Sequence, residues 1–339
     1  MDTKLFHTDD NEIAEAGEIL RNGGLVAFPT ETVYGLGASA FDSDAAKKIY
    51  AAKGRPSDNP LIVHICDKGQ IKDIAEEIPE SAKKVIDNFM PGPVTIILKK
   101  KSVVPNDVTA GLNTVAIRFP LHETAQKLIK AAGVPIAAPS ANLSGKPSPT
   151  KAKHVVKDMT GRIDAIIDGG ECNVGVESTI VDFTGEKPVI LRPGGVTYDD
   201  LKGIGLDVEI DKNILHSIEA DEVPKCPGMK YKHYAPNAEV TVVEGEKDAV
   251  QSKIKELLEQ TEGKVTGVLT MYGAVYDKAV MLSAGSTNKE YAKNLFAALR
   301  EFDELGVEVV FAEFSEKDGY GLAVKNRLYK AAAQRVIHV

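Results

Sequence analysis

Two short motifs combine residue types that suit a phosphate-rich ligand. The first carries Lys53 and Arg55 two positions apart, between a helical pattern and the apolar stretch 60–65. The second carries Ser140 and Asn142 at the end of another apolar stretch. Both motifs lie where regular elements end, so a rigid frame can present their side chains. Two fixed cations beside a hydroxyl and an amide favour a polyanion such as a nucleotide phosphate.

Further polar side chains follow or interrupt strand patterns. Arg118 lies in the strand pattern 115–119, where burial is costly unless a carboxylate or a phosphate meets it. A structural pair with an acidic residue is the alternative. His64 alternates with apolar neighbours, as structural strand histidines usually do. The four cations at element ends are Lys53, Arg55, Arg118 and Arg192. We predict that at least three of them cluster on one face of the fold.

Two glycine-containing strings also favour a ligand site. Residues 29–37 read PTETVYGLG and place hydroxyls and a carboxylate directly after a buried strand, with glycines that let a ligand approach the backbone. Residues 169–179 form a glycine-rich turn that enters a strand and carries Ser178. The relaxed G-x-G-x-x-A pattern at 35–40 does not lie in a turn from a strand into a helix, which disfavours a dinucleotide site. No P-loop sequence occurs.

Composition and charge narrow the class of protein. The chain has 339 residues, 27% of them charged, and a formal net charge of -8, which disfavours attachment to nucleic acid by bulk charge. Residues 91–160 nevertheless hold ten basic residues against three acidic ones. This basic region either attracts a phosphate-rich ligand or is an ordinary solvated surface.

The sequence shows neither a targeting pattern nor a cysteine motif. We find no apolar run long enough for a membrane span and no signal-peptide pattern, so we expect a cytoplasmic protein. Three isolated cysteines predict free thiols rather than a disulfide framework or a zinc site. They are Cys66, Cys172 and Cys226.

Alternating patterns predict an α/β fold with two domains. Strand patterns occur at 25–28, 61–65, 94–98, 115–119, 136–138, 165–167, 179–183 and 189–191, and helical patterns at 44–52, 81–89, 123–132 and 151–159. The apparent hairpin within 179–191 predicts a twisted, mixed, open sheet rather than a parallel one. A second set of strands, at 240–243, 264–269 and 307–311, alternates with helices at 249–260, 289–305 and 323–336. This set predicts a smaller, Rossmann-like α/β domain.

The segment between these two sets lacks strong periodicity. We therefore predict a first domain at 1–202, a linker at 203–237 and a second domain at 238–339. The linker residues 226–236 include two tyrosines, two lysines and a histidine, so this part either covers a ligand or is only a spacer. The role of the second domain is left open.

Taken together, these motifs resemble those of the YrdC-like threonylcarbamoyl-AMP synthases in their long, two-domain form. The resemblance rests on Lys-x-Arg, Ser-x-Asn, the 29–37 string, a P-G-P-x-T string at 91–95 and an S-T-I-V-D strand at 178–182. It implies condensation of L-threonine, bicarbonate or carbon dioxide, and ATP to threonylcarbamoyl-AMP and pyrophosphate. The product would pass to a separate transferase that modifies tRNA next to the anticodon, and direct tRNA contact is left open.

The resemblance also implies roles for individual residues. Lys53, Arg55, Ser140 and Asn142 would form the catalytic set. The threonine pocket would be lined by Thr32, His64, Arg118, Ala138 and Ser178, with the guanidinium of Arg118 on the substrate carboxylate. ATP would contact Arg55, Asn59, Thr114, Ser140, Ser148 and Arg192, and Tyr231 or Tyr234 would close over it. Mg²⁺ would accompany the phosphates without a dedicated protein cage.

Two other functions share some of these features. A carbamoyl-adenylate maturation enzyme has the same domain type, but such chains are longer and carry zinc-binding modules, whereas no C-x-x-C occurs here. A non-catalytic module for structured RNA would use the basic region instead. Such a binder would release no pyrophosphate and would bind RNA with steep salt dependence.

Overall fold

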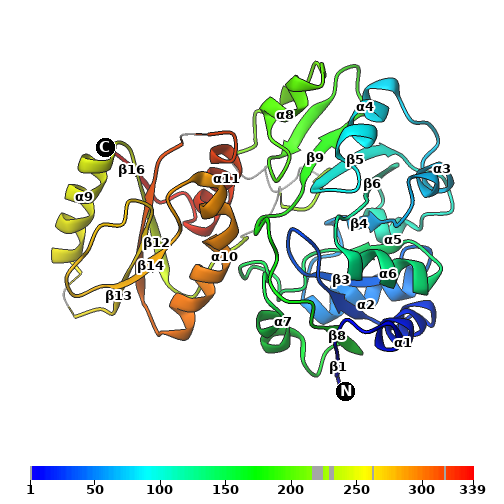
Figure 1. The fold of residues 1–339 in the computed structure, drawn as a ribbon, viewed down its shortest axis with the longest axis horizontal. Coiled ribbons are helices and arrows are strands. Elements are labelled where there is room, and N and C mark those ends of the chain that lie inside the picture. The colour runs from blue at the N-terminus through cyan, green and yellow to red at the C-terminus, as the bar shows by residue number, and fades with distance from the viewer. Residues whose placement is uncertain (1, 216–223, 229–232, 262, 317) are drawn as a thin grey trace. The chain divides into compact units, whose positions relative to one another are not determined.

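A computed structural model describes residues 2–215, 224–228, 233–261, 263–316 and 318–339. The described residues form two compact units. The first consists of those within 1–144 and 148–230, and the second of those within 145–147 and 231–339. Each unit has its own sheet (Figure 1). Among the described residues, no helix combines the length and apolarity needed to cross a membrane.

The first unit is built on an eleven-stranded sheet, which is mixed as predicted. In spatial order its strands are β1 (Lys4–Phe6), β8 (Ala165–Ile167), β2 (Val26–Phe28), β3 (Gly35–Ser39), β7 (Ile136–Ala138), β4 (Ile62–His64), β6 (Thr114–Arg118), β5 (Val94–Lys99), β9 (Thr179–Asp182), β10 (Val189–Arg192) and β11 (Glu209–Ile210). The predicted hairpin is the antiparallel pair β9–β10. Parallel pairs include β4–β6 and β5–β9.

Helices surround this sheet. They are α1 (Asp10–Arg21), α2 (Ser43–Lys53), α3 (Ile71–Ile74), α4 (Glu80–Phe89), α5 (Asn106–Thr109), α6 (Glu123–Ala132), α7 (Ala152–Met159) and α8 (Tyr198–Gly203), with a short 3-10 turn at Lys68–Gln70. The cap of α2 follows from its sequence. The carboxylate of Asp42 accepts hydrogen bonds from the amides of Asp44 and Ala45, and Gly54 ends the helix in the left-handed region.

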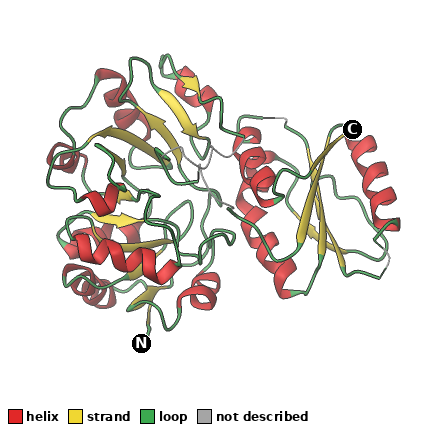
Figure 2. Cartoon of the chain, turned by 180° about the vertical axis from the view of Figure 1, so that it is seen from behind, coloured by secondary structure: helices red, strands yellow, loops and turns green. Residues whose placement is uncertain are grey.

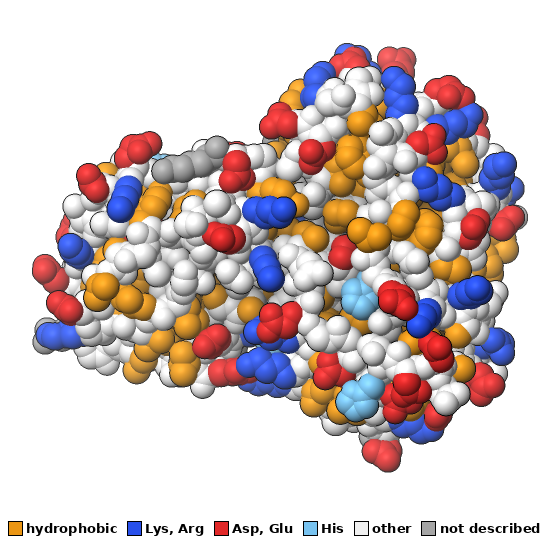
Figure 3. Space-filling model, in the orientation of Figure 1, with side chains coloured by type: hydrophobic (Ala, Val, Ile, Leu, Met, Phe, Trp, Pro, Cys, Tyr) orange, Lys and Arg blue, Asp and Glu red, His pale blue; other side chains and the backbone are white. Residues whose placement is uncertain are grey.

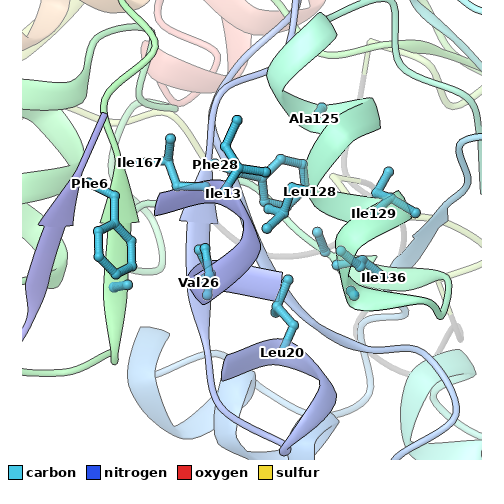
Figure 4. Packing of buried hydrophobic residues seen from close by; sticks show 14 residues of the cluster. Phe6, Ile13, Leu20, Val26, Phe28, Ala125, Leu128, Ile129, Ile136 and Ile167 are labelled. Atoms are coloured by element: carbon cyan, nitrogen blue, oxygen red, sulfur yellow. The ribbon is translucent and has the colours of Figure 1, made fainter. Parts of the chain in front are cut away.

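The core of the first unit lies between α1, α6 and one part of the sheet. Ile13 and Leu20 of α1 and Leu128 of α6 pack against Val26 and Phe28 of β2 (Figure 4). The two helices approach closely because Gly17 has no side chain: a Cβ there would lie 2.7 Å from that of Ala131. A larger residue at position 17 would force α1 away from α6.

The glycines of the 29–37 string have a packing role that sequence analysis did not anticipate. Gly35 and Gly37 belong to β3, which pairs antiparallel with β2. A Cβ on either residue would lie 3.0 Å from the ring of Phe28. The glycines therefore make room for this core aromatic side chain within the sheet. Elements β1, α1 and β11 were also not predicted, and β11 lies within the predicted linker.

The second unit is a five-stranded parallel sheet, which confirms the predicted Rossmann-like α/β architecture. Its strands, in spatial order, are β14 (Val280–Ser283), β13 (Thr266–Thr270), β15 (Val309–Phe314), β12 (Glu239–Glu244) and β16 (Val336–His338). Its helices are α9 (Lys247–Glu259), α10 (Asn288–Glu304) and α11 (Gly321–Ala331). Helix α9 covers one face of the sheet, and α10 and α11 cover the other (Figures 1 and 2).

Candidate active site

Side chains from several strands form a row on one face of the first sheet. His64 on β4 is opposite Arg118 on β6, and Arg118 is opposite Thr95 on β5. On the other side of β5, Ile180 on β9 is opposite Thr95 and also opposite Arg192 on β10. Partners across a sheet point to the same face, so these side chains project together. We call His64, Arg118, Thr95 and Arg192 the site row.

Arg118 forms a buried ion pair with Glu31. Its Nη2 lies 2.9 Å from Oε2 of Glu31, and the two side chains are only 5% and 7% exposed. Beyond this ion pair, neither Glu31 oxygen accepts a hydrogen bond, and Nε of Arg118 donates none, within the described residues. An unmatched buried donor therefore lies beside unmatched acceptors. The two charged ends of an α-amino acid would satisfy both.

Two threonine hydroxyls extend this arrangement. Nη2 of Arg118 donates to Oγ1 of Thr30 at 3.3 Å, and that oxygen lies 2.9 Å from Oγ1 of Thr32. Thr30 donates its own proton to the carbonyl of Val33 at 2.6 Å, so Thr32 is the donor between the two hydroxyls. The oxygen of Thr32 thus keeps an acceptor position. The glycine-rich turn fixes the loop, because the amide of Val174 donates to the carbonyl of Glu31 at 2.8 Å.

Ser178 links Arg192 to Thr95. Its hydroxyl lies 2.7 Å from that of Thr95, while Arg192 donates from Nη2 to this hydroxyl at 3.1 Å and from Nε to the Ser178 carbonyl at 3.0 Å. The turn after Arg192 packs directly on this backbone. A Cβ at Gly194 would lie 2.3 Å from the carbonyl oxygen of Glu177, so only glycine permits the contact.

Lys53 holds the Ser140–Asn142 motif rather than pointing into open solvent. It is the last residue of α2 and is buried. Its ammonium donates to the carbonyl of Ser140 and, at 2.5 Å, to the carbonyl of Asn142. The Ser140 hydroxyl in turn donates to Oδ1 of Asn142 at 2.6 Å. The two motifs singled out in the sequence are therefore in direct contact.

The predicted site residues fall at two ends of the strands. Near the start of β4, Nη2 of Arg55 donates to the carbonyl of Asn59 at 3.3 Å. Ser140 lies at this end, because Ala138 is opposite Ile62 and β7 runs antiparallel to β4. Thr114 begins β6, which is parallel to β4. His64 and Arg118 lie at the other end, about 13 Å away at 3.3 Å per residue.

This arrangement separates most of the predicted nucleotide residues from His64 and Arg118. Ala138, which was also predicted for the threonine pocket, is opposite Ile62 and lies between the two ends. Two nucleotide residues lie nearer the threonine group instead: Arg192 contacts Ser178, and Ser148 donates to Oε1 of Glu177 at 2.5 Å. The predicted clustering of three cations stays a prediction, since Arg118 and Arg192 share the site row whereas Lys53 and Arg55 do not belong to it.

The predicted linker contributes described residues to the site face. Cys226 packs with Ile62, Ala116 and Ile180, which come from three strands of the sheet. The carbonyl of Pro227 accepts a hydrogen bond from Nη1 of Arg192 at 3.4 Å. Part of the linker thus covers the sheet beside the site row. Tyr231 lies outside the described residues.

Tyr234 packs within the second unit. Its ring is buried, and its centroid lies 5.0 Å from that of Phe296 on α10. The prediction that Tyr234 closes over a nucleotide therefore stays a prediction.

Burial controls the protonation of the titratable site residues. Desolvation, together with the charge of Arg118, lowers the pKa of His64 to about 3, so this imidazole is neutral at physiological pH. Its Nδ1 lies 3.0 Å from the Ile62 carbonyl. Burial raises the pKa of the Cys172 thiol to about 12, which leaves it protonated and unreactive. Burial also lowers the pKa of His122.

Sequence analysis left several contact residues of the site without a role. Glu31 and Thr30 were quoted only as parts of a string, and Thr95 and Glu177 were not assigned. A buried arginine requires an acidic partner, so an acid directly after a buried strand was the available signal for Glu31. Thr95 was quoted only as the last residue of the P-G-P-x-T string, and its place beside Arg118 follows from the pairing of β5 with β6.

Comparisons with known proteins identify the family. A family model described as telomere recombination, for Sua5, YciO and YrdC proteins, matches residues 18–194. A second model, described as the threonylcarbamoyl-AMP synthase C-terminal domain, matches residues 196–333. The chain belongs to the Sua5/YrdC family, in the two-domain form of the threonylcarbamoyl-AMP synthases. This confirms the resemblance inferred from the motifs.

Relatives match over nearly the full length. The threonylcarbamoyl-AMP synthase of Pyrococcus abyssi is 51% identical over 330 residues, covering 97% of this chain and 96% of the relative. That of Bacillus subtilis is 49% identical over 340 residues, covering 99% and 97%. A crystal structure of P. abyssi Sua5 complexed with L-threonine superposes with a TM-score of 0.95 at 49% identity, covering 99% of this chain and all of that one.

The lowered pKa of His64 predicts a pH-dependent loss of stability. A pKa of about 3 in the folded state lies below the unfolded value of about 6.5, so the unfolded state binds the extra proton and stability falls as pH drops below 6.5. Between pH 6.5 and 5.0 this group contributes a loss of about 2 kcal/mol. Urea unfolding of the wild type and of His64→Gln should differ in pH dependence by that amount.

The exposed His7 provides the matched control. His7→Gln leaves His64 in place, so it should keep the pH-dependent loss of stability that is attributed to His64. Equal slopes for the wild type and His64→Gln would show that His64 is not buried as a neutral imidazole.

Proposed function

We propose that this chain condenses L-threonine, bicarbonate or carbon dioxide, and ATP to threonylcarbamoyl-AMP and pyrophosphate, using the site face of the first sheet. The proposal is supported by the full-length similarity to threonylcarbamoyl-AMP synthases. The observation that carries the active-site assignment is the Arg118–Glu31 pair, with its unmatched donor and acceptors. The product would be passed to a separate tRNA-modifying transferase.

The threonine subsite lies around the Arg118 end of the site row. The guanidinium of Arg118 would hold the substrate carboxylate through its unmatched Nε–H, while Glu31 would face the ammonium. Thr32 and the neutral His64 would complete the polar lining, and Ala138 and Ser178 would bound the pocket. The Thr32 oxygen, with its free acceptor position, suits the hydroxyl of threonine.

The nucleotide subsite would begin at the other end of the strands. Arg55, Asn59 and Thr114 lie near the start of β4 and β6, and Ser140 lies beside them. The phosphates would then extend toward the threonine subsite, where Ser148 and Arg192 would meet them. Lys53 would fix the motif of Ser140 and Asn142 near the phosphates. Tyr231 or Tyr234 would close over the nucleotide.

The chemistry requires positioning more than a protein nucleophile. The ammonium of threonine first loses a proton to water, the neutral amine then adds to the carbon of carbon dioxide, and loss of a second proton to water gives the carbamate. A carbamate oxygen then attacks the α-phosphorus, and the bond to the bridging oxygen of the β-phosphate breaks to release pyrophosphate. Fixed arginines oppose the negative charge that develops in this transfer. A site closed to water protects the labile carbamate and acyl-adenylate.

Several accompanying assignments remain part of this proposal. Mg²⁺ would enter bound to the phosphates of ATP, as this cation usually does in phosphoryl-transfer sites. Within the described residues, no group of three or more acidic, histidine or cysteine side chains is arranged to hold a metal.

We also propose a cytoplasmic location and functional boundaries at 1–202, 203–237 and 238–339. Cell fractionation and limited proteolysis would test these last two.

The rival function is a non-catalytic module that binds structured RNA through residues 91–160. On the face shown in Figure 3, basic and acidic side chains are interspersed rather than gathered by sign. Two lysines of the region also form ion pairs: Lys127 lies within 3.0 Å of the carboxylates of Asp10 and Glu123, and Lys151 lies 2.7 Å from that of Glu171. These contacts favour the enzyme over the binder.

The first test is the substrate dependence of pyrophosphate release. Purified protein should release pyrophosphate from ATP only when both L-threonine and bicarbonate are present, because the attacking oxygen belongs to the carbamate. Omission of either should reduce release to background. Release without threonine would contradict the proposed reaction, and salt-sensitive RNA binding with no release would support the rival.

A second prediction concerns Arg118. Replacing it with alanine should raise the Kd for threonine by at least about 100-fold, equivalent to about 3 kcal/mol, because a buried charge-assisted contact is lost. ATP affinity should change by less than about threefold. Titration calorimetry with each ligand measures both effects. Arg118→Lys should be only partly active, because it keeps the charge but not the planar fork.

Arg162→Ala removes an exposed arginine and serves as the control. It should leave both affinities unchanged. If Arg118→Ala folds and retains the wild-type affinity for threonine, the carboxylate assignment is wrong.

A third prediction concerns Lys53. Lys53→Met should lower kcat by about 100-fold, because the carbonyls of Ser140 and Asn142 lose the cation that fixes this motif beside the transferred group. KM for threonine should stay within about twofold. Steady-state kinetics of pyrophosphate release measure both parameters. An unchanged kcat in a folded variant would remove Lys53 from the catalytic set.

A further inference from the structure

Three residues that lie between Asn142 and Ser148 in the sequence belong to the second compact unit. Asn142 and Ser148 both lie in the first unit, whereas Gly145, Lys146 and Pro147 pack with residues of the second. The chain therefore leaves the first unit after Ser144, two residues beyond the Ser140–Asn142 motif, and returns at Ser148. We call residues 145–147 the excursion.

The excursion is held by a buried arginine of α10. Arg300 is 6% exposed, and its Nε and Nη2 both donate to the carbonyl oxygen of Pro147, at 3.0 and 2.6 Å. At the other end of the excursion, the amide of Ala235 donates to the carbonyl of Gly145 at 2.9 Å. Hydrogen bonds from the second unit therefore fix both ends. Hydrogen bonds from a charged donor are stronger than those between neutral groups, and here two N–H groups of one guanidinium donate to the same carbonyl oxygen.

The same turns of α10 organise the start of the second unit. Oδ1 of Asp303 accepts from the amide of Asn237 at 2.7 Å and lies 3.4 Å from that of Ala238. Tyr234 packs on Phe296, one turn before Arg300. Helix α10 thus holds the excursion together with the last residues of the predicted linker and Ala238.

The residues that flank the excursion are tied to the candidate active site. The amide of Ser144 donates to the carbonyl of Lys53 at 3.0 Å. On the other flank, the hydroxyl of Ser148 donates to Glu177, the residue before Ser178. Only one peptide bond separates Pro147 from Ser148, so a shift of the Pro147 carbonyl moves a residue assigned to the nucleotide.

We propose that Arg300 is a positioning residue for the nucleotide subsite, and that the second unit acts on the reaction by holding the excursion. This inference rests on the proposed function, because it uses the assignment of Asn142 to the catalytic set near the phosphates and of Ser148 to ATP. Arg300 touches no reacting atom. It fixes the carbonyl of Pro147 and thereby the path of the chain from the Ser140–Asn142 motif to Ser148. Displacements of about 1 Å at such positions lower rates substantially.

The test compares three variants of the full-length chain. Arg300→Met removes both donors at similar length, Arg300→Lys retains the charge with a single donor group, and Lys293→Met removes an exposed cation from the same helix. Arg300→Met should raise KM for ATP by about tenfold or more and leave KM for threonine within about twofold. Arg300→Lys should lie between Arg300→Met and the wild type, and Lys293→Met should match the wild type.

The selective change in KM separates positioning from general destabilisation. A variant that only loosens the fold would lower the melting temperature and affect both substrates alike, and that result would overturn the inference. An unchanged KM for ATP in a folded Arg300→Met variant would also overturn it. If Arg300→Met does not fold, Arg300→Lys carries the same test. Hydrogen exchange at the Ser144 amide should accelerate in either variant, because the excursion next to it is released.

A wild-type protein without activity would bear on the proposed function rather than on the role of Arg300. If the wild-type protein releases no pyrophosphate with all substrates present, the proposed function fails. If the wild type is active and the variants are indistinguishable from it, only the role of Arg300 fails.

Discussion

The candidate site depends on one buried charge pair, between Arg118 and Glu31. Moving two charges out of water is costly, and an ion pair in the interior offsets that cost only when its geometry is good and its other hydrogen-bonding positions are satisfied. Here Nε of Arg118 and both Glu31 oxygens lack hydrogen bonds in the described part of the chain. The folded protein therefore holds a pair that is only partly satisfied. An α-amino acid, which carries a carboxylate and an ammonium on one carbon, would complete it, so part of the binding free energy derives from groups already desolvated by folding.

The strand pairing of the sheet places further polar side chains beside this ion pair. Strand β6 is parallel to β4 and antiparallel to β5, so His64 and Thr95 flank Arg118 on the same face. Strand β9 pairs with β5, and β10 pairs with β9. This register places Arg192 on the same face, where its guanidinium donates a hydrogen bond to the hydroxyl of Ser178. A mixed sheet suits such a site, because ends of parallel and antiparallel strands meet at one level. Charged groups from distant parts of the sequence are then held by backbone hydrogen bonds rather than by loops, which restricts how far they can move.

Local patterns predicted the elements whose signals are local. The β9–β10 hairpin and the alternation of strands and helices in the second unit both follow from residues near one another in the chain. Helix α1 was missed although Ile13, Ala16 and Leu20 have helical spacing, because its acidic residues and Gly17 weaken the helical pattern. Gly17 is required by the close packing of α1 on α6, and that contact is visible only in the folded structure. Strand β3 was missed because its glycines indicate a turn until the ring of Phe28 is placed against them. The contact of Lys53 with the Ser140–Asn142 motif and the partnership of Glu31 with Arg118 depend on pairings across the sheet, which one sequence does not reveal.

The excursion at 145–147 shows why the second unit is more than an appended domain. A surface loop that was free at both ends would sample many conformations, and fixing it only on substrate binding would reduce affinity by the entropy lost. Arg300 and the Ala235 amide fix the excursion before any ligand arrives, so that entropy is lost during folding. The stability of the second sheet, with α10 packed on it, is thereby used to order a stretch that belongs in sequence to the first domain. A chain that lacked this unit would need another means of ordering the same stretch, such as a shorter loop or a proline-restricted turn, to reach the same affinity for its nucleotide.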